Sequence, residues 1–142
     1  MLTFRRILAA AILLAMAGPA QAQDAARRHG NLLALSRALG ESQALREACE
    51  GKQDQYWRSR MMRLLSVENA EGAAGAPLTA AFNAGYGQTR AAFPDCGPES
   101  RRAEVDAAVR GQELAVLLAG PAPAASPETP APDDVAAPPD AR

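Results

Sequence analysis

Apolar residues recur every three or four positions along most of residues 31–119, which is the spacing that builds one face of an α-helix. Four such stretches, separated by glycine and proline, predict four helices. The first spans residues 31–49. Its inward face is expected to consist of Leu32, Leu35, Leu39, Ser42, Leu45 and Cys49. Gly40 interrupts this stretch, so we expect a kink or a break there, and Gly51 is placed to end the helix.

The other three helices are marked by residues that favour helix ends. The second is predicted to start near Asp54, a good N-cap residue, and to end in a glycine-rich stretch. The third begins at Pro77 and ends before Pro94, and the fourth runs from Pro98 to Gly120. Their inward faces are expected to consist of Trp57, Met61, Leu64, Leu65, Leu78, Phe82, Tyr86, Phe93, Val105, Val109, Val116 and Leu117.

Composition supports an all-α fold. After residue 22 the chain has no isoleucine, its larger apolar side chains are mostly leucine, and alanine fills much of the rest. Leucine and alanine lose little conformational freedom in a helix. Because short connections favour antiparallel neighbours, the predicted architecture is a small four-helix up-down-up-down bundle.

The beginning of the chain has the three parts of a secretory signal peptide. Arg5 and Arg6 precede an uncharged apolar run of 11 residues, and an Ala-Gln-Ala triplet follows it. This pattern predicts cleavage between Ala22 and Gln23. A membrane span needs about 20 apolar residues, so we expect no stable membrane span after cleavage.

The last part of the sequence, residues 120–142, is rich in proline and alanine and acidic. It holds seven prolines, and its four acids against one arginine give a net charge of −3. Such a composition offers too little apolar side chain to offset the entropy of ordering, which predicts a disordered tail. A solvating role is favoured over a spacer or a partner-binding strand. The chain therefore divides into a signal peptide (1–22), a helical domain (23–119) and this tail.

The two cysteines are expected to form a structural disulfide. Cys49 lies at the end of the first predicted helix and Cys96 just after the third, and these two ends share one pole of an up-down-up-down bundle. Two cysteines in an exported protein are usually bonded. A redox-active pair is disfavoured, because such sites typically use a C-x-x-C spacing.

Charge and motif content argue against several classes of function. Residues 23–119 carry twelve acids and twelve basic residues, whereas nucleic-acid binding requires a basic excess. The single histidine, His29, lies near the predicted new N-terminus, so neither a nucleophilic triad nor a zinc site has its ligands. No glycine-rich phosphate loop occurs. We therefore expect no cofactor, no metal and no nucleic-acid partner.

A small hydrolase that uses a carboxylate pair is the alternative function. Its candidate acids are Glu41, Glu47, Glu68 and Glu71. Most acids, however, have a basic residue at helical spacing, which is typical of solvated helix faces. The pairs expected on this ground are Arg37–Glu41, Arg46–Glu50, Asp54–Arg58 and Arg102–Asp106. The chain is thus predicted not to be an enzyme.

Residues 56–63 combine aromatic and basic side chains. Trp57 falls on the apolar stripe of the second helix, while Arg60 and Arg63 share another face. Two interpretations are open. The favoured one is an ordinary helix with a core aromatic and solvated arginines, and the other is a shallow site where arginines meet carboxylate or phosphate.

Residues 82–87 place two glycines inside the third helix, at a cost of about 1 kcal/mol each relative to alanine. Close approach of another helix along Ala81, Gly85 and Thr89 is the favoured reason. A pocket floor flanked by Asn83 and Tyr86 is the alternative. The possible partner-binding residues are thus Trp57, Arg60, Arg63, Asn83 and Tyr86.

A scattered set of residues carries a family resemblance. The set is Leu39-Gly40, Leu45-Arg46, Cys49, Trp57-Arg58, Met61, Phe82-Asn83, Gly85-Tyr86 and Cys96. It resembles an uncharacterised family of short alphaproteobacterial exported proteins that have a signal peptide and two cysteines, and it spans roughly residues 32–118. The resemblance implies bacterial origin and a bonded cysteine pair, and it carries no catalytic or binding role.

These observations together predict an exported periplasmic protein that acts as a non-catalytic binding module of the cell envelope. Its expected partner is an unidentified envelope protein or an anionic envelope component. A purely structural role, as an envelope-stress or assembly factor, is a further possibility.

Overall fold

The computed structural model describes residues 18–120 of the chain, and this part contains helices and no strand. The elements are α2 (Gly18–Glu50), α3 (Tyr56–Val67), the short 3-10 helix η2 (Gly72–Gly75), α4 (Ala76–Ala92) and α5 (Pro98–Ala119). Within the described part, no helix is both long and apolar enough to cross a membrane. The apolar run of the predicted signal peptide and nearly all of the predicted tail lie outside the described residues.

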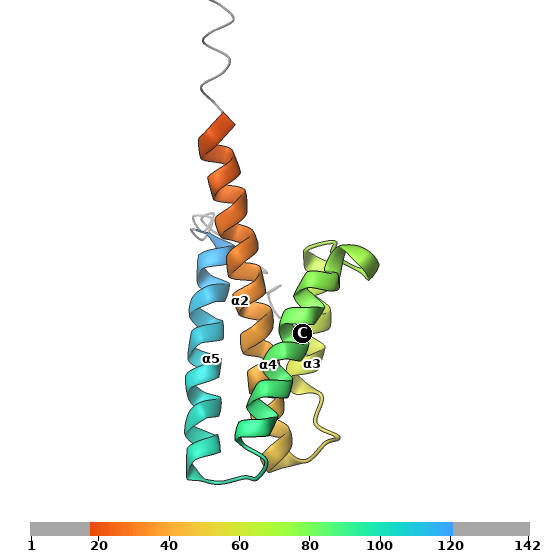
Figure 1. Ribbon diagram of the computed structural model, residues 1–142, viewed down its shortest axis with the longest axis vertical. Helices are drawn as coiled ribbons and strands as arrows, with labels where there is room; N and C mark the ends of the chain where they lie inside the picture. Colours follow the sequence, from red (N-terminus) through yellow and green to blue (C-terminus); the bar gives the residue numbers. More distant parts are fainter. Residues whose placement is uncertain (1–17, 121–142) are drawn as a thin grey trace, which may run out of the picture.

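Helix α2 is the centre of the bundle, and the other three helices pack along it (Figure 1). Its most extensive contacts are with α4, followed by α5 and then α3. Consecutive helices run in opposite directions, so that α2 and α4 point one way and α3 and α5 the other. The predicted all-α up-down-up-down bundle is therefore confirmed.

The core consists of the apolar faces of the first three helices. The buried cluster is formed by Leu32, Leu35, Leu39, Met61, Leu78 and Phe82. Leu64, Leu65 and Trp57 pack against this cluster while remaining partly exposed. The periodicity of the sequence predicted each of these positions, because each residue lies on the apolar stripe of its own helix.

Two glycines let α2 and α4 approach closely. Helix α2 continues through Gly40 without a break. A side chain at Gly40 would collide with the backbone carbonyl of Phe82, and one at Gly85 would collide with the carbonyl of Arg37. Gly87 has no such neighbour within 4 Å. The close approach predicted at Gly85 is confirmed, and Gly40 plays the same part on the facing helix.

Helix α2 starts much earlier than residue 31, the start that the apolar pattern predicts. It begins at Gly18, and residues 20–30 are exposed. An exposed helix needs no apolar stripe, because alanine, glutamine and arginine favour helix on their own and Asp24 pairs with Arg27 one turn later. The predicted cleavage site, Ala22–Gln23, lies in this exposed part, and cleavage there stays a prediction.

The predicted inward face of α5 is wrong. The four residues that were expected to face inward are exposed, with exposed fractions of 52% to 66%. These residues are Val105, Val109, Val116 and Leu117. The helix instead turns another stripe toward α2. It holds the buried Ala107 and the adjacent Gly111, and it continues with Leu114 and Leu118, which pack against the buried cluster. Small side chains allow the two backbones to lie close together, and this close packing leaves the valines on the outside.

The disulfide predicted between Cys49 and Cys96 is confirmed, with the two alpha carbons 4.7 Å apart. It joins the last turn of α2 to the loop between α4 and α5. Next to it, the buried hydroxyl of Ser100 accepts a hydrogen bond from the Gly97 backbone N–H and donates one to the Gly97 carbonyl. The sulfur link and this cap fix the start of α5 at the same pole as the end of α2.

A candidate partner-binding groove between α3 and α5

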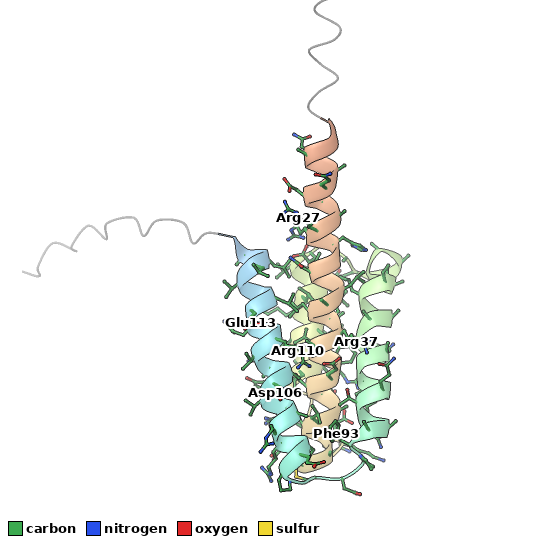
Figure 2. All side chains as sticks on the ribbon, turned by 60° about the vertical axis from the view of Figure 1, so that its left-hand side comes forward. Arg27, Arg37, Phe93, Asp106, Arg110 and Glu113 are labelled. Carbon is green, nitrogen blue, oxygen red and sulfur yellow. A yellow bond between two sulfur atoms is a disulfide. The ribbon has the colours of Figure 1, made fainter. Side chains whose placement is uncertain are left out.

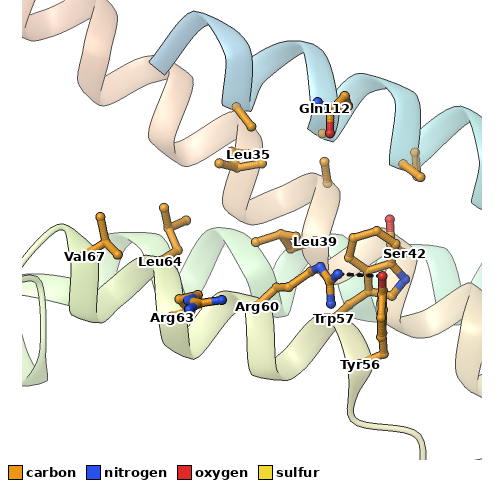
Figure 3. Close-up of a pocket in the computed structure, with 15 residues that line it drawn as sticks. Leu35, Leu39, Ser42, Tyr56, Trp57, Arg60, Arg63, Leu64, Val67 and Gln112 are labelled. Carbon is orange, nitrogen blue, oxygen red and sulfur yellow. Dashed lines mark hydrogen bonds between the residues drawn. The ribbon is translucent and has the colours of Figure 1, made fainter. Parts of the chain in front are cut away.

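A groove with a volume of about 410 Å³ runs between α3 and α5, with α2 as its floor (Figure 3). It exists because both helices pack on α2 without substantial contact with each other. The floor is formed by Leu35, Ala38, Leu39 and Ser42. The α3 wall is formed by Tyr56, Trp57, Arg60, Arg63, Leu64 and Val67, and the α5 wall by Ala107, Ala108, Gly111, Gln112 and Ala115.

The two walls differ in character. The α5 wall is built almost entirely from small residues, which is why space remains between the helices. On a helix surface, residues three and four positions apart are neighbours. The exposed Val105 and Val109 therefore lie beside the lining residues Ala108 and Gln112, and they extend the apolar surface past the rim of the groove.

The α3 wall holds an ordered group of aromatic and basic side chains. The Arg60 guanidinium lies 3.6 Å from the centre of the Tyr56 ring, and its Nη2 donates a 2.6 Å hydrogen bond to the Tyr56 hydroxyl. The Tyr56 and Trp57 rings meet edge to face, with centroids 4.9 Å apart. Arg60 is thus held at the groove by contacts with uncharged rings, and its own charge is not neutralised.

Seven of the eleven arginines of residues 18–120 form an ion pair with a carboxylate there, namely Arg27, Arg28, Arg37, Arg46, Arg58, Arg90 and Arg110. The other four, Arg60, Arg63, Arg101 and Arg102, form none within these residues, and of these only Arg60 and Arg63 line the groove. Two guanidinium groups are therefore free to bind an anionic group at the wall of an apolar groove.

Trp57 contributes a second unsatisfied group. Its indole Nε1 is the one buried side-chain nitrogen or oxygen of the described residues that has no hydrogen-bond partner. A buried donor without an acceptor destabilises a fold by about 1–3 kcal/mol.

Of the five residues proposed to bind a partner, the structure brings together Trp57, Arg60 and Arg63, which all line the groove. The other two, Asn83 and Tyr86, lie on α4 and do not line it. Asn83 is exposed, and Tyr86 is half-buried against Glu47. The two candidate segments thus lie on different helices, and only the one on α3 contributes to the groove.

The side chain of Gln43 fixes the start of α3, and sequence reasoning missed it. Gln43 is fully buried, and its Oε1 accepts the backbone N–H groups of Trp57 and Arg58 at 3.1 and 2.9 Å. Its Nε2 donates to Glu47 at 2.9 Å and to the Asp54 carbonyl at 2.6 Å. A glutamine inside a leucine stripe was the available signal. Gln43 is a positioning residue for the aromatic end of the groove.

Asp54 was predicted as the N-cap, but the N-cap of α3 is Gln55, and Asp54 lies one residue earlier, from where its side chain still binds the first turn. Its Oδ1 accepts the backbone N–H of Tyr56 at 3.0 Å, and its Oδ2 accepts a 2.9 Å bond from Arg46. The hydrogen bond from the Tyr56 backbone, together with the bond from Arg46, lowers the pKa of Asp54. The negative charge therefore persists at the helix N-terminus, where the helix dipole favours it.

A buried carboxylate, Glu47, ties three helices together behind the groove. The Tyr86 hydroxyl donates to Glu47 at 2.7 Å and accepts a 2.7 Å bond from Arg90. Nitrogens of Arg58 and Arg90 lie 3.9 and 3.5 Å from the Glu47 carboxylate. Burial, reinforced by the bond to Glu47, raises the pKa of Tyr86. The cluster links α2, α3 and α4, and it holds the α3 wall in place.

The Glu47 cluster yields a stability prediction. Glu47→Gln is expected to lower the free energy of unfolding by about 2 kcal/mol, because hydrogen bonds to charged groups are worth about 1.5–3 kcal/mol. Glu50→Gln, at an exposed site three residues later, serves as the control and should change stability by less than about 0.5 kcal/mol. Urea unfolding of both variants measures the difference. Equal effects at the two positions would contradict the structural role of Glu47.

Most helical ion pairs predicted from spacing are wrong. Within the described residues, Arg37–Glu41 forms at 3.1 Å, but the other three do not. The remaining arginines reach acids on other elements instead, as in Arg46–Asp54, Arg46–Glu104, Arg58–Glu47 and Arg110–Glu41. Arg37 of α2 and Arg110 of α5 both bind Glu41 near the line where the two helices meet (Figure 2). Spacing along one helix carries no information about a partner on the next.

The four acids considered as a hydrolytic carboxylate pair lie outside the groove. Glu41, Glu47 and Glu68 are each bound by at least one arginine, and the hydrogen bond from Arg28 lowers the pKa of Glu68. Glu71 is exposed. None of these four acids lines the groove. Within residues 18–120, no group of three or more histidines, cysteines or acids is placed to hold a metal ion.

Comparison with known proteins identifies a family. A family model described as "Protein of unknown function (DUF2385)" matches residues 28–120, which include α3, α4, α5 and most of α2. Comparisons with curated proteins and with solved structures give no match. The matched residues contain every residue that lines the groove and both cysteines.

Proposed function

The chain belongs to the DUF2385 family of proteins of unknown function, and from its groove we propose that it is an exported, non-catalytic binding module. The groove between α3 and α5 binds an acidic, partly apolar segment of an envelope protein. The observation that carries this proposal is the position of Arg60 and Arg63, which lack carboxylate partners within residues 18–120 and stand at the wall of an apolar groove.

The chemistry of the groove defines the segment that fits it. The leucines of the floor, together with Trp57 and Leu64, favour apolar side chains. Arg60 and Arg63 favour carboxylates, which guanidinium groups bind with paired hydrogen bonds. A segment that alternates small apolar residues with acids can make both kinds of contact. It can do so as an extended strand or as one face of a helix.

Export to the periplasm is supported by the sequence and by the sulfur link. The first 22 residues have the basic, apolar and small-residue parts of a cleaved signal peptide. A structural disulfide such as Cys49–Cys96 persists in an oxidising compartment and is rare in a reducing cytosol. The groove would then face partners in the cell envelope.

A pull-down from envelope extract tests the binding role. The double variant Arg60→Ala/Arg63→Ala is expected to recover at least about tenfold less partner, because the loss of about 1.4 kcal/mol of binding energy weakens affinity tenfold. Arg101→Ala/Arg102→Ala is the matched control. It removes the same charge from arginines that do not line the groove, and it should recover as much partner as the unaltered protein.

Equal recovery by both double variants would contradict the proposal. Circular dichroism and the midpoint of thermal unfolding, measured for all three proteins, show whether the variants keep the fold. Both pairs of arginines are exposed, so neither double substitution is expected to shift the midpoint by more than a few degrees.

A further inference from the structure

The groove and the tail carry charges of opposite sign. Residues 23–119 are neutral overall, yet the α3 wall of the groove presents two arginines without carboxylate partners in the described structure. Residues 121–142 carry a net charge of −3. At physiological salt, exposed charges attract one another over only about 8 Å. The tail must therefore come close to the groove for this complementarity to matter.

The position of the tail brings it close. Ala115 lines the groove one turn before α5 ends at Ala119, so the tail begins beside the end of the groove that Val67 closes. Within α3, the rise from Tyr56 to Val67 is about 17 Å at 1.5 Å per residue. An extended proline-rich chain rises about 3.1 Å per residue, so the eight steps from Gly120 to Glu128 cover about 25 Å. The acids of the tail can thus reach both arginines.

The composition of the tail also matches the walls. Proline-rich segments bind aromatic-lined grooves because they are already extended and lose little entropy on binding. The groove offers Tyr56 and Trp57 on one wall and small residues on the other. The apolar residues of the tail are alanine, proline and a single valine, which are small enough for such a narrow space.

We propose, on the basis of the binding role of the groove, that residues 121–142 occupy it in the same chain and that a partner binds by displacing them. A short flexible connection gives the tail an effective concentration of about 1 mM. If the tail alone binds with a dissociation constant of about 0.1 mM, it occupies the groove about nine-tenths of the time and weakens a partner roughly tenfold.

Trp57 is the only tryptophan in the chain and lines the groove, so its fluorescence reports what covers the groove. The test compares acrylamide quenching of Trp57 in the full mature chain and in a neutral-tail variant. That variant carries Glu128→Gln, Asp133→Asn, Asp134→Asn and Asp140→Asn. We expect the quenching constant to rise about twofold in the variant, and to rise similarly in 1 M NaCl, where screening extends to about 3 Å.

A matched control removes four charges elsewhere. It carries Glu50→Gln, Glu71→Gln, Asp95→Asn and Glu99→Gln, all at exposed acids that do not line the groove, and it should quench like the unaltered chain. Arg60→Ala/Arg63→Ala should raise the quenching constant as much as the neutral tail does. Combining the two sets of substitutions should add nothing further, because both remove the same contact.

Three outcomes would overturn the proposal. They are unchanged quenching in the neutral-tail variant, an equal change in the four-charge control, and quenching that depends on protein concentration, which would indicate a second copy in the groove. The neutral-tail variant should also recover several-fold more partner in the envelope pull-down. If quenching is unchanged while the pull-down still depends on Arg60 and Arg63, the tail proposal fails and the binding function stands.

Discussion

Removal of the disulfide between Cys49 and Cys96 is expected to lower the free energy of unfolding by about 4 kcal/mol. The bond closes a loop of 47 residues, and the chain-entropy model assigns a stabilisation of that size to such a loop. A domain of about 100 residues is stable by only about 5–15 kcal/mol in total. We therefore expect the double variant Cys49→Ser/Cys96→Ser to be close to unfolding at 37 °C.

Urea unfolding of the double variant and of the unaltered protein, each with and without a reducing agent, measures this effect. The reducing agent should destabilise the unaltered protein by about the same 4 kcal/mol. The double variant serves as its own control, because it has no bond to reduce and should not respond. A difference of less than about 1 kcal/mol between the two proteins would mean that the bond adds little to the stability of the bundle.

The second large effect is expected at the contact between α2 and α4. Gly85→Ala should lower the free energy of unfolding by about 3 kcal/mol, which is the upper part of the range for overpacked cores. The added Cβ would collide with the backbone carbonyl of Arg37, and a backbone atom cannot move aside as a side chain can. The two helices must separate, and this separation also disturbs the Glu47 cluster that joins them.

Gly87→Ala is the matched control for this substitution. Gly87 lies two residues further along α4, with nothing within 4 Å of the Cβ it would gain. Alanine is favoured over glycine inside a helix by about 1 kcal/mol, so this variant should be more stable than the unaltered protein. Thermal unfolding of both variants should thus show shifts of opposite sign. Shifts of the same sign would contradict the close approach of α2 and α4.

Much of the fold could be predicted because local signals marked it. Pro77 and Pro98 mark the starts of α4 and α5, and Gly120 ends α5, as helix-end preferences require. The extension of α2 back to Gly18 left no such signal. An exposed helix is indistinguishable by periodicity from a polar loop, since neither has an apolar face.

The orientation of α5 could not be read from its apolar residues. Val105, Val109 and Val116 form one apolar stripe, yet the helix packs a second one, which holds Ala107, Gly111, Leu114 and Leu118. The face of α5 that packs is set by the distance between the axes of α2 and α5. This distance depends on the side chains of both helices. The groove exists because of this choice, so the sequence alone could not predict it.

The candidate site was predicted in part for a similar reason. Trp57, Arg60 and Arg63 lie within two turns of one helix, so the sequence could predict that they are near one another. It assigned Trp57 to a different face from the two arginines, and only the structure shows that all three line one groove. Asn83 and Tyr86 belong to α4, and only the packing of the bundle shows that they lie away from the groove. The role of Gln43 also depends on packing, because it caps a helix that begins thirteen residues later in the chain.

Site-specific photocrosslinking in living cells tests the central claim most directly, namely that the groove between α3 and α5 is occupied. A photoreactive phenylalanine analogue would replace Gln112, on the α5 wall, or Asn83, an exposed residue of α4 outside the groove. Position 112 is predicted to crosslink to residues 121–142 or to a partner polypeptide, and position 83 to neither. Crosslinks of equal yield from both positions, or none from position 112, would contradict the claim.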